Sequence, residues 1–148
     1  MQQRVVRDGE PVRLPVDGDD GAVFHLMRRV LQQHGARWVA ALPEMTKAQW
    51  AVLRATADDR CDQNTVAERT AIDKATLVPL IARLVDRGWL TRETDAADRR
   101  RRQLRLTDAG RAALAHATPI VAAVDAAALD DLDAAERARL RRLLTRLV

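Results

Sequence analysis

The chain is constrained most by the stretch that begins at Asp73, where the apolar residues first follow a helical period and then alternate with polar ones. The helical stripe consists of Leu77, Ile81, Leu84 and Val85, which recur at i, i+4, i+7 and i+8. Asp73 suits the N-cap of this helix, and Gly88 suits the position just past its end. Two short strands follow at 89–94 and 102–106, joined by a polar turn, which predicts a β-hairpin.

A second short helix is expected immediately before this one, from about residue 64 to residue 70. Val66 and Ala67 would face inward, and Ala71 and Ile72 would turn the chain into the helix that runs from about 74 to 87. Two helices joined by about three residues form a helix–turn–helix. Because a hairpin follows directly, the sequence predicts a winged helix–turn–helix.

The remainder of the chain is predicted to be helical. A long helix is expected at 22–42, ended by Pro43, and another begins after Thr46, whose partner Gln49 completes a capping-box pattern. Residues 57–63 are expected to form a loop. The fold class is therefore mainly α with a minor β component.

Two closing helices are expected after the hairpin. The first begins at Thr107 or Asp108 and runs to about Ala128, with Pro119 expected to kink it or divide it in two. The last begins at Asp130 or Asp133 and has an apolar stripe near its end. The residues of that stripe are Leu140, Leu143, Leu144 and Leu147.

The positive charge of the chain is concentrated in one segment. Of a formal net charge of +4 over 148 residues, residues 88–106 carry six arginines and three acids, which is +3. A local basic patch on a near-neutral body favours an anionic partner, most often nucleic acid. No apolar run is long enough to span a bilayer and the N-terminus lacks the apolar core of a signal peptide, so we expect a cytoplasmic protein without a membrane partner.

The sequence gives no support for catalysis. It contains no nucleophile motif, no phosphate-binding glycine loop and no zinc-protease motif. Three histidines and one cysteine fall short of a closed zinc set, so neither a metal nor another cofactor is expected. These four residues are His25, His34, His116 and Cys61.

The middle of the chain resembles the MarR family of bacterial transcription regulators. The similarity covers about residues 45–110 and is carried by IDKATL, LVDRGWLTR, DAADRR and LTDAG, in that order and spacing. Ala96 stands where the family often has proline. The resemblance implies an obligate homodimer in which 21–45 and 107–148 form the helical dimerisation region. Residues 46–106 would form the DNA-binding lobe of one compact domain, and 1–20 a flexible arm.

The recognition helix is expected to enter the major groove of double-stranded DNA. Basic and hydroxyl side chains there can reach phosphates or guanine edges, and small apolar ones suit thymine methyl groups. The expected contacts are Lys74, Ala75, Thr76, Val78, Pro79 and Arg83. The alternative is a solvated helix face. Gln63, Asn64 and Thr65 open the preceding helix, where backbone amides favour phosphate, although plain capping explains them equally well.

The turn of the hairpin carries four consecutive arginines. Asp98, followed two residues later by Arg100, resembles the Asp-x-Arg element of the family's wing. We expect Asp98 to orient an arginine and fix the turn, and one or two of Arg99, Arg100 and Arg101 to reach the minor groove. Because strand side chains alternate between faces, Arg102 and Arg105 are expected to contact phosphates or serve a structural role.

A small-molecule site is expected on the first helix. The stretch HLMRRVLQQH resembles the first helix of family members that respond to aromatic acids. There Arg28 would pair with a carboxylate, His34 would bind a ring hydroxyl, and Trp38 and Trp50 would stack on the ring. Arg29 and Arg37 are further candidates. The alternative is that the tryptophans are core and the arginines are solvated.

We therefore expect a homodimeric repressor that leaves a pseudo-palindromic operator when a small aromatic acid or phenol binds, such as a hydroxylated benzoate or pyridine carboxylate. Regulation of aromatic catabolism would fit such a ligand. Three alternatives stay open: a redox switch through Cys61, a DNA-binding protein without an effector, and a winged helix that binds protein.

Overall fold

A computed structural model describes residues 20–57, 61–94 and 102–148. Side chains of Asp20 and Arg102 lie outside this description. Within these ranges the chain forms six helices and a small three-stranded sheet. The elements in chain order are α1 (Asp20–Ala41), α2 (Lys47–Thr56), β1 (Cys61–Asp62), α3 (Gln63–Thr70), α4 (Lys74–Asp86), β2 (Leu90–Thr94), β3 (Arg102–Leu106), α5 (Asp108–Ala128) and α6 (Ala134–Thr145).

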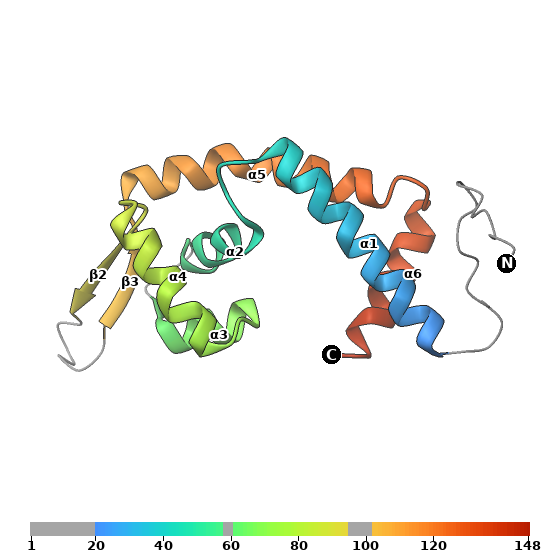
Figure 1. Ribbon diagram of the computed structural model, residues 1–148, viewed down its shortest axis with the longest axis horizontal. Coiled ribbons are helices and arrows are strands. Elements are labelled where there is room, and N and C mark those ends of the chain that lie inside the picture. The colour runs from blue at the N-terminus through green and yellow to red at the C-terminus, as the bar shows by residue number, and fades with distance from the viewer. Residues whose placement is uncertain (1–19, 58–60, 95–101) are drawn as a thin grey trace, which may run out of the picture.

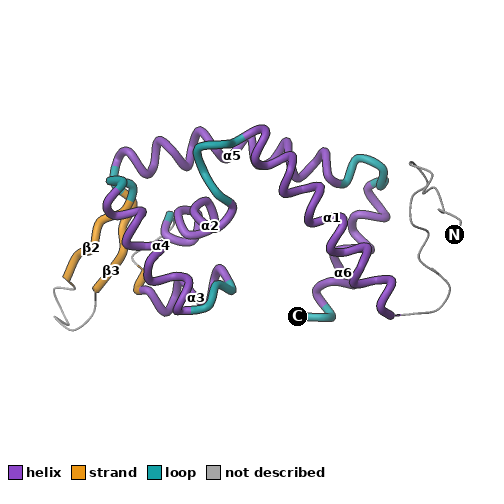
Figure 2. The backbone as a smooth tube through the Cα atoms, viewed as in Figure 1, coloured by secondary structure: helices purple, strands orange, loops and turns teal. Residues whose placement is uncertain are grey.

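The elements are arranged as an arch. Helix α5 runs along its top and joins the lobe made of α2, α3, α4 and the strands to the region that holds α1 and α6 (Figure 1). Figure 2 shows that β2 and β3 lie at the end of the lobe farthest from α6. The mainly helical fold with a small β component is therefore as predicted.

The capping residues in the sequence predicted the ends of the lobe helices correctly. Thr46 and Gln49 form the complete capping box at the start of α2. Asp73 caps α4 by accepting a hydrogen bond from the Thr76 amide at 2.9 Å. Gly88 has φ of 77°, a left-handed conformation that glycine adopts without steric cost just after a helix. Each of these signals acts within a few residues, which is why sequence alone identifies it.

The expected loop at 57–63 is wrong in part, because Cys61 and Asp62 form strand β1. The sheet order is β1-β3-β2, and both neighbours pair antiparallel with β3. Cys61 lies opposite Leu104 in this register. A two-residue strand is too short to show alternation, so only its pairing with a distant segment reveals it.

Helix α5 is continuous across Pro119, so the expected division of this helix is wrong. Pro119 and Ala115, the residue whose carbonyl loses its helical donor, are both exposed. Water can therefore hydrogen-bond to that carbonyl, and flanking alanines with high helix propensity continue the helix.

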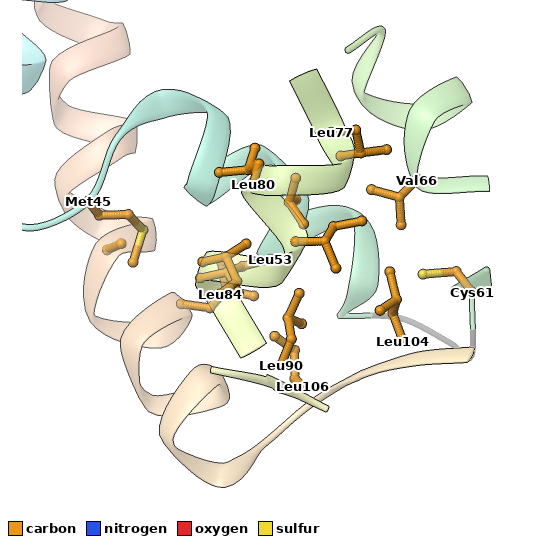
Figure 3. Packing of buried hydrophobic residues seen from close by; sticks show 14 of the residues in the cluster. Met45, Leu53, Cys61, Val66, Leu77, Leu80, Leu84, Leu90, Leu104 and Leu106 are labelled. Carbon is orange, nitrogen blue, oxygen red and sulfur yellow. The ribbon is translucent and has the colours of Figure 1, made fainter. Parts of the chain in front are cut away.

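The hydrophobic core lies mainly inside the lobe. Leucine side chains from α2, α4 and the hairpin converge there, and Cys61 packs beside Val66 and Leu104 at one edge (Figure 3). Large apolar side chains along α1 and near the C-terminus stay exposed. They are Val23, Phe24, Leu26, Val30, Leu31, Val39, Leu143, Leu144, Leu147 and Val148.

None of the helices in the described ranges combines the length and the apolar character that a membrane-spanning segment needs.

Candidate nucleic-acid interface and effector site

Helix α4 turns its predicted DNA-contacting residues to solvent. The buried side of the helix packs Leu77, Leu80, Ile81 and Leu84 into the core. The opposite side exposes all six predicted residues, which are Lys74, Ala75, Thr76, Val78, Pro79 and Arg83. Val78 is 48% exposed and, among the described residues, is the lobe's one exposed large apolar side chain. This surface therefore offers both cationic groups and an apolar contact.

Thr76 already uses its hydroxyl and its amide in hydrogen bonds within the protein. Its hydroxyl donates to Asp73 Oδ2 at 2.7 Å, while its amide donates to Asp73 Oδ1. These bonds, the hydroxyl first, hold the pKa of Asp73 below its ordinary value. Because the hydroxyl proton is already donated to Asp73, exposed Thr76 can offer DNA an acceptor oxygen and a methyl group but no hydroxyl donor.

The first turn of α3 is capped in the same manner. Asp62 accepts hydrogen bonds from the Thr65 amide and from the Thr65 hydroxyl, both at 2.9 Å. Gln63 is half-buried and Asn64 is exposed beside it. Of the three residues predicted here, Asn64 presents its side chain most fully, and Thr65 serves the cap.

The wing residues predicted to read DNA, Asp98, Arg99, Arg100 and Arg101, lie outside the described residues. The strands that precede and follow them in the sequence, β2 and β3, are described. Arg105 of β3 lies 3.4 Å from Glu93 of β2, an ion pair between half-exposed side chains. This contact fits the structural role expected for Arg105.

The predicted ligand residues of α1 and α2 form an aromatic cluster. The ring centroids of Trp38 and Trp50 lie 6.0 Å apart in an edge-on arrangement, and those of His34 and Trp38 lie 6.1 Å apart. Trp38 is buried, and its indole N–H donates to the Met45 carbonyl at 2.7 Å. The indole nitrogen of Trp50 is buried and has no hydrogen-bond partner among the described residues.

His34 also joins three helices through polar contacts. Its Nδ1 lies 2.5 Å from Lys47 Nζ of α2, and its Nε2 lies 2.7 Å from Asp125 Oδ1 of α5. Lys47 Nζ stands 6.0 Å from the centroid of the Trp38 ring. The cluster of Lys47, His34, Asp125, Trp38 and Trp50 is called the His34 site below.

Arg28 is exposed on α1 and does not join the His34 site within one chain. Six residues separate it from His34, which places it roughly 120° around the helix. An apolar groove of about 710 Å³ lies on a different part of the α1–α5 contact. It is lined by Arg37, Ala40, Ala41, Pro119, Ile120, Ala123, Val124 and Ala127.

The family assignment rests on comparison with known proteins. The model of the MarR family matches residues 44–101. The transcriptional regulator HosA of Escherichia coli is 43% identical over 126 residues, which cover 84% of this chain and 93% of that protein. The chain belongs to the MarR family. It is a transcriptional regulator, as the sequence motifs predicted.

Solved structures of MarR-family proteins confirm the winged-helix fold. BpsR of Bordetella bronchiseptica, whose DNA binding is regulated by 6-hydroxynicotinic acid, is 36% identical, with a TM-score of 0.77 over 84% of this chain and 97% of that one. PcaV of Streptomyces coelicolor, solved with its natural ligand, is 35% identical, with a TM-score of 0.80 over 94% of this chain and 96% of that one.

Sequence reasoning missed Lys47 and Asp125 of the His34 site. Asp125 lies 91 residues from His34, so no local pattern connects them. Lys47 did carry a signal: it is the first residue of α2, where a cation opposes the helix dipole and an acid is the usual choice. A residue that breaks this preference is a candidate for a functional role.

Cys61 is buried, and the described histidines do not gather with other ligand types into a metal site. Cys61 is 2% exposed within the core. Across the described ranges, no three His, Cys, Asp or Glu side chains come close enough together to hold a metal ion.

Proposed function

We propose that this MarR-family regulator is a homodimeric, sequence-specific DNA-binding repressor that a small aromatic acid or phenol releases from a pseudo-palindromic operator. The observation that carries the proposal is the outer face of α4. It presents Lys74 and Arg83 on either side of Val78, and among the described residues no carboxylate pairs with either cation. Unpaired cations around an apolar contact suit phosphates and base edges in a major groove.

The exposed apolar residues of α1 and the C-terminal region support the homodimer. Phe24 is 61% exposed, Leu31 is 63% exposed and Leu147 is 73% exposed. Exposed large apolar side chains in this number are unusual on a monomer and are typical of a surface that a partner covers. A symmetric dimer would present two lobes to two half-sites about 10 base pairs apart.

The His34 site supports the effector. Aromatic rings, a cation and an indole N–H that has no acceptor among the described residues are groups that can recognise a hydroxylated aromatic acid. BpsR, which is regulated by such an acid, is similar over most of the chain. Trp38 and Trp50 would contact the ring of this ligand. Arg28 lies outside the His34 site within one chain, so it would pair with the ligand's carboxylate only across the proposed dimer.

The DNA-binding part is tested by selecting sequences from a random duplex pool and measuring affinity for the enriched site by fluorescence anisotropy. We expect a palindromic consensus, and a slope of log affinity against log salt that becomes shallower by about 1 for each phosphate that a variant no longer neutralises. Replacing Arg99, Arg100 and Arg101 by Ala should reduce both affinity and slope. Failure to enrich any sequence, or an unchanged slope, contradicts the proposal and favours a protein-binding winged helix.

The variant Asp98→Ala tests whether Asp98 orients a DNA-contacting arginine or whether the arginines bind DNA only through their general positive charge. If Asp98 orients an arginine, the variant binds operator less tightly although its net charge is more positive. Tighter binding would show that the arginines act only as general positive charge.

Release of the operator by an aromatic acid distinguishes the proposed ligand-controlled repressor from the two remaining alternatives. An aromatic acid that weakens operator binding excludes a regulator without an effector. A redox regulator would instead respond to oxidant and lose that response on Cys61→Ser; the burial of Cys61 argues against this interpretation.

A further inference from the structure

The hydrogen bonds around His34 fix which of its nitrogens carries a proton. A lysine ammonium can only donate, so Nδ1, at 2.5 Å from Lys47 Nζ, must be the acceptor. An ionised carboxylate can only accept, so Nε2, at 2.7 Å from Asp125 Oδ1, must carry the proton. His34 is therefore neutral, with its single N–H directed at an anionic oxygen.

Lys47 brings a positive charge that no carboxylate pairs with directly among the described residues. It is half-buried at the N-terminus of α2, whose first turn contains no acid. The partial positive charge of the helix end adds to that of the ammonium. The site thus favours an additional anion, and the carboxylate of Asp125 is the one that the chain itself supplies through His34.

Asp125 is a replaceable occupant of this position. Its side chain is 58% exposed, whereas that of His34 is only 18% exposed. An exposed carboxylate exchanges its partner for water or another anion at little cost. Because Asp125 lies on α5 and His34 on α1, replacing it would also break a polar contact between these two helices.

We propose that an anionic or carbonyl oxygen of the effector takes the place of the Asp125 carboxylate at His34 Nε2, with Lys47 as the cation that holds it. This inference rests on the effector part of the proposed function and names the chemistry of one end of that ligand. The oxygen belongs either to the carboxylate of the acid or to the ring oxygen in its oxo or phenolate form. A neutral hydroxyl that must donate its proton does not fit, because Nε2 is itself a donor.

The proposal predicts opposite effects for two neighbouring residues. Asp125→Ala removes the internal competitor and should tighten the binding of 6-hydroxynicotinate about fivefold. Lys47→Met removes the cation while keeping a side chain of similar length, and should weaken binding about tenfold or more. Isothermal titration calorimetry of the full-length protein measures both.

Asp131→Ala is the matched control, because it deletes an exposed acid from the turn after α5. This variant should bind 6-hydroxynicotinate with an affinity within about twofold of the wild type's. Affinity that falls in Asp125→Ala, that rises equally in Asp131→Ala, or that is unchanged in Lys47→Met overturns the proposal. Thermal unfolding of each unliganded variant identifies any that fails to fold.

Two ligand analogues identify the oxygen. Nicotinate lacks the ring oxygen, and 6-hydroxynicotinamide lacks the carboxylate. The analogue that retains the oxygen bound at His34 should keep the opposite responses to Asp125→Ala and Lys47→Met, and the other should lose them. If both analogues lose the responses, or both keep them in full, no single oxygen replaces Asp125 and the proposal is overturned.

A measurement without ligand separates this inference from the proposed function. Long-range nitrogen–proton NMR of the histidine ring at neutral pH should show protonated Nε2 and unprotonated Nδ1 for His34, and Lys47→Met should alter this pattern. Protonated Nδ1 in the wild type overturns the inference even if an aromatic acid binds. Conversely, a wild type with the expected pattern that binds no aromatic acid overturns the effector part of the proposed function, and with it the exchange at Asp125.

Discussion

Asp73 begins the recognition helix and carries a charge that the fold stabilises. The Thr76 hydroxyl and amide donate to its carboxylate, which lowers its pKa below the ordinary value of 3.8. A lowered pKa means that the stabilising effect is present above the ordinary value and is lost as pH falls through the folded value.

Asp73→Asn should therefore change the acid dependence of stability. Asparagine also caps a helix well, so the variant keeps the cap and loses the charge. The stability of the wild type relative to the variant should fall as pH decreases below about 3.8, the ordinary aspartate value. Urea unfolding of both proteins across the acid range measures this, and parallel curves would contradict the assignment.

Gly110 allows the first turn of α5 to lie directly on the wing. A Cβ at this position would lie 2.0 Å from the Trp89 carbonyl oxygen, which already accepts the Thr107 amide. Gly110→Ala should thus lower the free energy of unfolding by about 3 kcal/mol. In contrast, Gly35→Ala meets only Lys47 Nζ, at 3.8 Å, and should stabilise α1 by about 0.5 kcal/mol. Denaturant unfolding of both variants measures whether the free energy of unfolding falls in Gly110→Ala and rises in Gly35→Ala. Similar stability for the two variants would contradict this packing.

At the scale of elements, the loop between α1 and α2 connects the His34 site to the recognition helix. The Trp38 indole donates to the Met45 carbonyl at 2.7 Å. Arg87, the C-cap of α4, donates to the adjacent Glu44 carbonyl at 3.0 Å and stacks on the Trp89 ring at 3.7 Å. A change at Trp38 can thus reach α4 through two neighbouring peptide groups.

Arg87→Ala should uncouple the effector from DNA. We expect the variant to bind 6-hydroxynicotinate within about twofold of the wild type. The effect of this acid on operator affinity should be at least about fivefold smaller than in the wild type, because typical coupling free energies are about 1–3 kcal/mol. Anisotropy titrations with and without the acid give the coupling. Arg69→Ala is the control, since it removes a similar arginine–carbonyl bond, to Ala55, away from this loop. Equal loss of coupling in both variants would contradict a route through Arg87.

Elements set by local chemistry could be predicted from the sequence, and those set by distant partners could not. Thr46, Asp73 and Gly88 determine helix ends within a few residues, and the wing strands alternate visibly. Strand β1 exists only because β3 pairs with it. Likewise, the sequence marks His34 and the two tryptophans as candidates, but the contact between His34 and Asp125 depends on how α1 crosses α5.

For the whole molecule, the exposed apolar side chains divide into two sets with different expected roles. Phe24 lies on α1 and Val78 lies on α4. Figure 1 shows that α4 belongs to the lobe and that α1 extends away from it. Phe24→Asp should dissociate the proposed dimer, because it would place a charge in an apolar contact. Val78→Asp should leave the dimer intact and weaken operator binding at least tenfold through repulsion from phosphates. Light scattering and anisotropy separate the effects; a dimeric Phe24→Asp variant would contradict the assignment of α1 to the interface.

The most direct test of the regulator is its affinity for its selected operator as an aromatic acid is added. With 6-hydroxynicotinate and the hydroxybenzoates as probes, at least one acid should weaken wild-type binding tenfold or more at constant salt. The same acid should act less strongly on Lys47→Met and more strongly, at low concentration, on Asp125→Ala. An operator affinity that none of these acids changes would contradict repression controlled by an aromatic acid.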